Sequence, residues 1–272
     1  MPLVRVAPDL EMFYRLDDFT DPWRPSEVVL LLHGVAENGG VWFAWVPHLA
    51  RRFRVLRPDM RGFGQSTPMP AQFRWSLDRI VEDYAALLAG LGIARVHLVG
   101  AKLGGMIALH FAATRPDLVS TLTVLGGPVS GKQVPTATMP SIVHEFEKHG
   151  VETWSRINMD KRLGSAMPSE AKEWMAQTMG KTPVSTLTGC FRDDVGFDVS
   201  HELEQISCPA LIVTTTASGL GSVEQVRASQ QKIPNSELEI LQGDSFHVAF
   251  AEADRCAART LAFIGSHTPP PP

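Results

Sequence analysis

The sequence VGAKLGGM at residues 99–106 joins two patterns that belong to different kinds of secondary structure. An apolar run at residues 96–99 has the length of a buried strand, and the apolar, alanine-rich pattern of residues 106–112 is typical of a helix. Glycines stand two positions before and two positions after Lys102. The pattern therefore predicts a strand that turns sharply into a helix, with Lys102 at the turn.

Strand-like and helix-like segments alternate on both sides of this turn. An opening antiparallel hairpin is predicted over residues 1–20. Further strands are predicted at residues 28–32, 53–56, 119–125, 210–214 and 238–241. Further helices are predicted at residues 42–51, 77–91, 223–233 and 253–263. This rhythm predicts an α/β fold with a mostly parallel central sheet and helices on both of its faces.

The alternation is interrupted between residues 130 and 205. This region is helical in pattern and rich in polar residues, and it contains no clear strand. We interpret it as a helical cap inserted over one edge of the sheet. The expected organisation is a core formed by residues 1–129 and 206–267, a cap over residues 130–205, and a disordered tail at residues 268–272, where the proline run lies.

Composition excludes several classes of function. The chain has 272 residues, 44% of them hydrophobic and 20% charged, with a net charge of −4. Such a charge provides no basic surface for nucleic acid or for a membrane. Its three cysteines lack paired or metal-type spacing, and neither a leader nor a membrane span is evident, so a cytoplasmic location is predicted. We expect a small-molecule substrate without cofactor or metal; the oligomeric state is left open.

Four motifs in sequence order resemble those of the α/β-hydrolase superfamily. They are His33-Gly34, the loop PDMRGFGQS at residues 58–66, the glycines around Lys102, and GDSFH at residues 243–247. The chain is most similar in pattern to capped small-molecule members such as enol-lactonases, carbon–carbon bond hydrolases and haloperoxidase-like esterases. The resemblance implies an α/β-hydrolase fold, with the turn at residues 100–104 as its nucleophile elbow.

The same resemblance assigns positions to a catalytic triad, and two of the three have changed. Lys102 stands where the G-x-S-x-G motif has its serine, and His247 matches the histidine. The acid position falls within residues 214–222, which contain no carboxylate, and the best alignment places Ser218 there. The backbone amides of Val35 and Leu103 correspond to the oxyanion hole, which no change of side chain at residue 102 removes.

A lysine at this position is expected to have an unusual pKa. Burial beneath a cap and the positive end of the following helix both disfavour an ammonium group. A half-neutral amine at pH 7 requires a fall of about 3.4 in pKa, or roughly 4.6 kcal/mol. Nearby carboxylates would oppose that fall, and Glu37 and Asp244 are the candidates in the sequence.

Lysine and histidine at these positions permit three functions. A neutral Lys102 amine could form a Schiff base with a ketone, which favours carbon–carbon cleavage or decarboxylation of a small carbonyl or carboxylate compound. Alternatively, His247 could activate water to hydrolyse an ester, lactone or carbon–carbon substrate, with Lys102 as a base or as a charged clamp. A non-catalytic ligand-binding or regulatory protein is the third alternative. A serine-type cycle is disfavoured, because an acylated lysine would be a stable amide.

Other side chains are expected to support the site or the fold. Glu37 is interpreted as a solvated loop charge, with support of the site as its alternative. Trp42 is assigned equally to the core or to the pocket wall, and Trp154 to packing within the cap or to the pocket. His33 is predicted to orient its loop.

Overall fold

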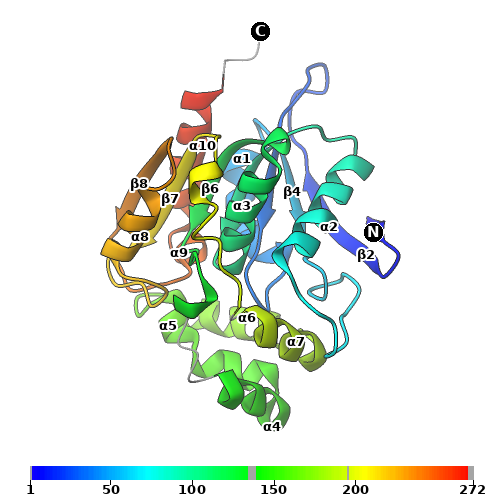
Figure 1. The fold of residues 1–272 in the computed structure, drawn as a ribbon, viewed down its shortest axis with the longest axis vertical. Coiled ribbons are helices and arrows are strands. Elements are labelled where there is room, and N and C mark those ends of the chain that lie inside the picture. The colour runs from blue at the N-terminus through cyan, green and yellow to red at the C-terminus, as the bar shows by residue number, and fades with distance from the viewer. Residues whose placement is uncertain (1, 134–138, 195, 269–272) are drawn as a thin grey trace.

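A single sheet forms the centre of the computed structural model, which describes residues 2–133, 139–194 and 196–268 (Figure 1). Its strands are β1 (Leu3–Ala7), β2 (Leu10–Asp17), β3 (Val28–Leu32), β4 (Arg54–Pro58), β5 (Val96–Ala101), β6 (Val119–Leu125), β7 (Ala210–Thr215) and β8 (Ser236–Leu241). Their order across the sheet is β1-β2-β4-β3-β5-β6-β7-β8. The pairs β1–β2 and β2–β4 are antiparallel, and all later neighbours are parallel. The predicted α/β-hydrolase architecture and its opening hairpin are thereby confirmed.

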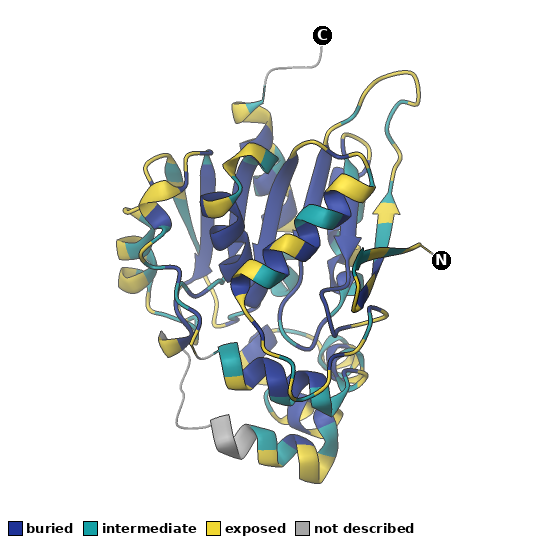
Figure 2. Ribbon diagram, turned by 45° about the vertical axis from the view of Figure 1, so that its right-hand side comes forward, coloured by how far each residue is buried: buried dark blue, intermediate teal, exposed yellow. Residues whose placement is uncertain are grey.

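Helices cover both faces of this sheet. The α-helices are α1 (Val46–Leu49), α2 (Leu77–Gly90), α3 (Leu103–Thr114), α4 (Met139–Ile157), α5 (Met159–Leu163), α6 (Ser169–Gly180), α7 (Val184–Asp194), α8 (Val223–Gln230), α9 (Val248–Ala251) and α10 (Ala253–His267). Short 3-10 helices are η1 (Gly39–Trp45), η2 (Pro116–Leu118), η3 (Gly131–Gln133) and η5 (Leu203–Gln205). Every residue of β3 and β5 is buried, as Figure 2 shows for the central strands, because parallel strands have helices packed on both faces.

The helix predicted over residues 42–51 is divided in the structure. The 3-10 helix η1 runs to Trp45, and the single-turn helix α1 follows it at Val46. Pro47 stands in the first turn of α1, where its missing N–H is tolerated, but it cannot donate to an uninterrupted helix. Of the predicted disordered tail, residues 269–272 lie outside the described residues.

The helices α4 to α7 gather at one end of the sheet (Figure 1). They lie between β6 and β7 in sequence, and residues 139–194 contain no strand. An isolated β-bridge between Ser130 and Asp198 brings together the two chain segments that flank them. The Thr186 hydroxyl, from α7, accepts a hydrogen bond from the Met69 N–H at 3.0 Å, which joins these helices to a loop of the sheet. They are hereafter called the α4–α7 segment.

The turn between β5 and α3 has the strained backbone of a nucleophile elbow. Lys102 has φ 55° and ψ −119°, a region that a residue with a side chain rarely adopts. Two glycines make the turn possible. A Cβ on Gly100 would lie 2.1 Å from the Gly104 carbonyl oxygen, and a Cβ on Gly104 would lie 2.3 Å from the Leu32 carbonyl oxygen. Helix α3 can therefore approach the sheet closely enough to hold Lys102 above its edge.

Replacing Gly104 by alanine should destabilise the protein by about 3 kcal/mol, because the new methyl group would collide with two backbone carbonyls that cannot move aside. Gly265 in α10 has no heavy atom within 4 Å of the corresponding position. Gly265→Ala should therefore raise the free energy of unfolding by about 1 kcal/mol, because alanine favours a helix more than glycine does. Urea unfolding monitored by circular dichroism measures both changes. Equal stability of the two variants would contradict the close-approach argument.

Candidate active site

The side chain of Lys102 turns toward the loop that follows β3. A Cβ built on Gly34 would lie 2.5 Å from Lys102 Cε, so the aliphatic chain of the lysine runs along the Gly34 backbone. Its Nζ forms an ion pair with Glu37 Oε1. Both side chains are buried, at 5% exposure for Lys102 and 1% for Glu37. The prediction of Glu37 as a solvated loop charge is therefore wrong, since its carboxylate lies at the centre of the site.

One carboxylate oxygen of Glu37 faces three basic side chains. Besides Lys102, Oε1 lies 3.2 Å from His247 Nε2 and 3.6 Å from Arg162 Nη1. The other oxygen, Oε2, accepts a hydrogen bond from the Gly34 N–H at 3.1 Å. A single anion is thus shared by a lysine, an arginine and an imidazole, all buried.

Hydrogen bonds to neighbouring loops hold Glu37 in this position. Asp59 accepts the Gly39 N–H at 2.7 Å, just beyond Glu37. His33 Nε2 accepts the Met60 N–H at 2.9 Å, and its Nδ1 lies 2.8 Å from the Gly34 carbonyl oxygen, which makes Nδ1 the donor of a neutral ring. The predicted loop-orienting role of His33 is confirmed.

Asp59 and Arg61 lie close together in the loop after β4, but they do not pair with each other in the described structure. The structure gives them separate partners. Asp59 accepts backbone N–H groups and pairs with Arg15 at 3.3 Å, and the Arg61 guanidinium binds Asp83 and Asp9 at 2.7 and 2.8 Å. Each side chain therefore fixes the loop independently.

Burial changes the pKa values of these side chains, and so does the presence of a single carboxylate among several basic groups. Burial and the nearby Arg162 charge lower the pKa of Lys102 to about 7, against the opposing attraction of Glu37. Burial would raise the pKa of Glu37, but its neighbours His247, Lys102 and Arg162 outweigh burial and hold it well below its usual range. Because an arginine keeps its proton, the lysine is the cation that gives one up.

His247 has a different environment from the histidine of a serine triad. Its backbone N–H donates to the Arg162 carbonyl at 2.9 Å and to Ser245 Oγ at 3.0 Å, which fixes the residue in place. Nε2, the atom that faces the nucleophile in a triad, lies beside Glu37, although the pair is not aligned for a hydrogen bond. Burial, ahead of any charge, lowers the pKa of His247 to about 4, so the ring is neutral at pH 7.

Ser218 does not provide the support predicted for it. Its hydroxyl accepts a hydrogen bond from the Leu220 N–H at 3.3 Å, within its own loop. His247 Nδ1, the atom that an acid binds in a triad, has no hydrogen-bond partner in the described part of the chain. The alignment placed Ser218 at the acid position, but the hydroxyl turns back to its own backbone.

A cavity of about 780 Å³ lies beside Lys102, between the sheet edge and the α4–α7 segment. Its wall includes Lys102, Val35 and Leu103 from the core and Trp154 and Arg162 from the α4–α7 segment. No acceptor for the N–H of Val35 or of Leu103 is found among the described residues, so both amides are available to a ligand. Trp154 lines this cavity and also packs edge-on against Phe146 of α4, with 4.7 Å between ring centroids.

Trp42 and Asp244 lie differently from Trp154. Trp42 is 1% exposed and packs edge-on against Trp45, and it is not part of the cavity wall, so its core assignment holds. Asp244 does line the cavity, but it is exposed and accepts the Ser165 N–H at 3.1 Å instead of binding Lys102. Arg162 was not singled out from the sequence, because nothing in its pattern distinguishes it from a solvated helix residue.

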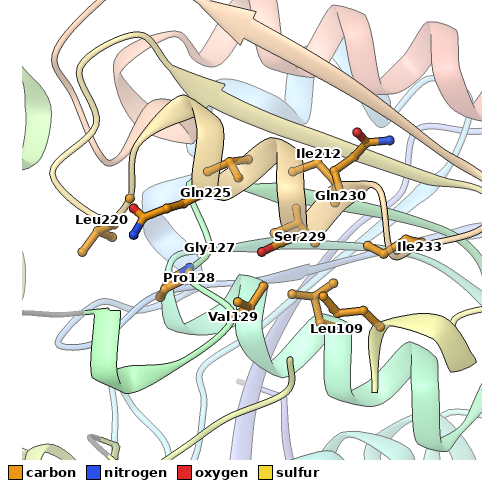
Figure 3. Close-up of a pocket in the computed structure, with 14 residues that line it drawn as sticks. Leu109, Gly127, Pro128, Val129, Ile212, Leu220, Gln225, Ser229, Gln230 and Ile233 are labelled. Atoms are coloured by element: carbon orange, nitrogen blue, oxygen red, sulfur yellow. The ribbon is translucent and has the colours of Figure 1, made fainter. Parts of the chain in front are cut away.

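Other features in the described residues offer less chemistry. A second cavity of about 30 Å³ lies between α3 and α8 and has room for little more than a water molecule (Figure 3). Its labelled polar side chains, Gln225, Ser229 and Gln230, all come from α8, and no ionisable side chain lines it. No group of three or more potential metal ligands occurs within the described ranges. None of the helices there has the length and hydrophobicity to cross a membrane.

Comparison with known proteins places this architecture in a family. The family model for the alpha/beta hydrolase fold matches residues 27–159. An uncharacterized protein of Mycobacterium bovis is 34% identical over 278 residues, which cover 92% of this chain and 79% of the relative. The chain belongs to the α/β-hydrolase superfamily. The enol-lactonase from Burkholderia xenovorans has the same fold, with a TM-score of 0.87 at 18% identity over 97% of this chain and all of that one.

Two relatives within the superfamily have names that state an activity. A protein of Agrobacterium fabrum with the provisional name carbamate hydrolase RutD is 25% identical over 93% of this chain and 98% of its own length. The pimeloyl-[acyl-carrier protein] methyl ester esterase of Aeromonas hydrophila is 28% identical over 76% of this chain and 72% of its own. Both of these relatives are named as hydrolases, one of a carbamate and the other of a methyl ester.

Because Glu37 is shared, substitutions of Glu37 and of Lys102 should change stability at pH 7 by different amounts. Glu37→Gln should lower the free energy of unfolding by about 3–5 kcal/mol, because it leaves Arg162 buried without an anion. Lys102→Met leaves one anion and one cation and should be neutral or stabilising by about 1 kcal/mol. Urea unfolding compares the two, and Glu11→Gln in the exposed Arg5–Glu11 pair is the control, expected to change stability by less than about 1 kcal/mol. The prediction fails if Lys102→Met costs as much as Glu37→Gln.

Proposed function

We propose that this α/β-hydrolase-fold enzyme uses the Lys102 amine as a nucleophile on the ketone of a small keto acid and cleaves a carbon–carbon bond, either by decarboxylation or by a retro-aldol step. The observation that carries the proposal is the position of Lys102. It lines a large cavity, is buried, and shares the carboxylate of Glu37 with Arg162. A lysine that is desolvated beside another cation is an activated nucleophile.

The two cations are suited to different parts of a keto acid. Arg162 lines the cavity, so its guanidinium group can bind a substrate carboxylate. The free N–H groups of Val35 and Leu103 are the donors that would stabilise the ketone oxygen as it gains negative charge. The substrate would then present its carbonyl carbon to Lys102 Nζ.

The chemical step balances with groups already in the site. Nζ attacks the carbonyl carbon, and loss of water from the carbinolamine gives a protonated Schiff base. In decarboxylation, the bond from the carbon next to the iminium carbon to the carboxylate breaks and CO2 leaves. In the retro-aldol step, the bond from that carbon to the carbinol carbon breaks, the hydroxyl proton passes to Glu37, and an aldehyde or ketone leaves. In both cases the electron pair of the broken bond moves into the iminium to give an enamine. Protonation of the enamine carbon and hydrolysis by water release the shortened ketone and regenerate the amine.

Glu37 and His247 are assigned to proton transfer. The Glu37 carboxylate contacts Nζ, so it can accept the proton that the amine loses on attack. His247 Nε2 lies 3.2 Å from the same carboxylate oxygen, so the two could exchange a proton once substrate binding aligns them. In this proposal His247 acts through Glu37, and Lys102 is the residue that touches the substrate.

Hydrolysis by His247-activated water is the second candidate, and the names of the relatives favour it. The geometry weighs against it, because Glu37 lies at Nε2, where the attacking water would bind, and Nδ1 has no acid to orient the ring. A ligand-binding protein without turnover is the remaining alternative, supported by the same cavity.

Borohydride trapping tests the lysine mechanism. With small 2-oxo and 3-oxo acids, reduction should add to the protein the mass of the keto acid less one oxygen atom, and peptide mapping should locate the adduct at Lys102. Lys102→Met should form no adduct and should lose turnover of the same compound by at least a thousandfold. Turnover without an adduct, or full activity in Lys102→Met, would refute the mechanism.

The pH dependence of kcat/KM should report the amine. Because Lys102 reacts only when deprotonated, kcat/KM should rise through about pH 7 and then level off. Glu37 raises the pKa of Lys102, so in Glu37→Gln the rise should move to lower pH while the plateau falls with loss of the proton acceptor. Steady-state kinetics between pH 5 and 9 measure both. A rise that stays in place in Glu37→Gln would show that Lys102 is not the titrating group.

A further inference from the structure

The cavity beside Lys102 contains a carboxylate that the mechanism does not use. Asp194, at the end of α7, lines this cavity, and no described side chain or backbone group binds its carboxylate. Two other acidic residues of the same wall are satisfied. Asp160 pairs with Lys172 at 2.7 Å, and Asp244 accepts the Ser165 N–H. Asp194 is therefore the carboxylate of the wall that has no partner in the described part of the chain.

Its position makes a lone negative charge unfavourable. Burial in the cavity raises the pKa of Asp194 to about 6. The C-terminal end of a helix adds the negative end of the helix dipole, and Asp193 lies next to it in sequence. Of the basic residues in the same wall, Lys102 and Arg162 face Glu37 and Lys172 pairs with Asp160. Lys161, the fourth, forms no ion pair with Asp194 among the described residues. A positive group bound in the cavity would therefore stabilise the Asp194 carboxylate.

Aromatic side chains line the cavity close to Asp194. Phe191 lies three residues earlier in α7 and therefore on the same face of the helix. Trp154 meets Phe191 edge-on at 5.9 Å between ring centroids, and both line the cavity. Aromatic faces beside a carboxylate attract organic cations, because the ring quadrupole and the carboxylate charge act in the same direction.

We propose that Asp194, Trp154 and Phe191 form a subsite for an organic ammonium group within the Lys102 cavity. The subsite rests on the proposed function and narrows its substrate class. The expected substrate is a keto acid that also carries an alkylammonium group. The carboxylate and ketone bind at Arg162 and Lys102, and the ammonium binds at Asp194. One ligand would thereby place its carboxylate at Arg162 and its ammonium group at Asp194.

The subsite is tested by equilibrium binding without turnover. The probes are choline and 3,3-dimethyl-1-butanol, which have nearly the same shape and differ by one positive charge. Ligand-observed NMR titrations at pH 8 should show choline binding to the wild-type chain at least tenfold more tightly than the neutral alcohol. Asp194→Asn should abolish this preference, and the control Asp244→Asn, which alters a satisfied carboxylate of the same wall, should keep it.

The outcomes separate this subsite from the lysine mechanism. Equal affinity of the two probes for the wild-type chain, or a preference that persists in Asp194→Asn, would overturn the subsite. The comparison of probes on the wild-type chain decides this even if the variant is unstable. Lys102→Met should retain the choline preference, since the subsite does not require the amine. If borohydride trapping fails while the wild-type chain still prefers choline, only the lysine mechanism is refuted. If trapping succeeds but choline is not preferred over the neutral alcohol, only the subsite is refuted.

Discussion

The site depends on one carboxylate, Glu37, being shared by two buried cations. A lysine that alone faced a buried carboxylate would be held in its charged form, because separating the pair would leave an unpaired anion. Arg162 changes this balance, since it approaches the same oxygen at 3.6 Å and keeps its own proton. Glu37 then remains paired when Lys102 loses its proton. Burial and the arginine together therefore make a neutral amine compatible with a buried acidic neighbour.

The elbow determines where that amine can act. Lys102 occupies a strained backbone position that the surrounding structure enforces through Gly100 and Gly104. The strain lifts the residue to the sheet edge whatever its side chain is. A serine reaches only the atoms immediately above the turn, whereas the lysine extends along Gly34 to Glu37. The same backbone thus places the Lys102 nitrogen close to the loop that follows β3 and contains the Val35 N–H.

Sequence could predict the parts of this molecule that follow from local rules. The elbow glycines, the alternation of strands and helices, and the positions of Lys102 and His247 all depend on short patterns. Glu37, Arg162 and Asp194 depend instead on which charges are buried together, and a charged residue in a loop or on a polar helix usually faces water. Ser218 shows the converse difficulty: an alignment can place a hydroxyl at the acid position, yet its orientation is set by the Leu220 N–H.

Arg162 also connects the chemistry to the α4–α7 segment. Its guanidinium faces Glu37, while its carbonyl oxygen accepts the His247 N–H at 2.9 Å and the Ser245 hydroxyl at 2.8 Å. Any displacement of α5 would therefore move the charge that lowers the Lys102 pKa and the loop that positions His247 in one step. Without Arg162, burial alone would oppose the attraction of Glu37, and the pKa of Lys102 would be higher. The pKa of Lys102 and the part of the cavity wall formed by α5 consequently both depend on Arg162.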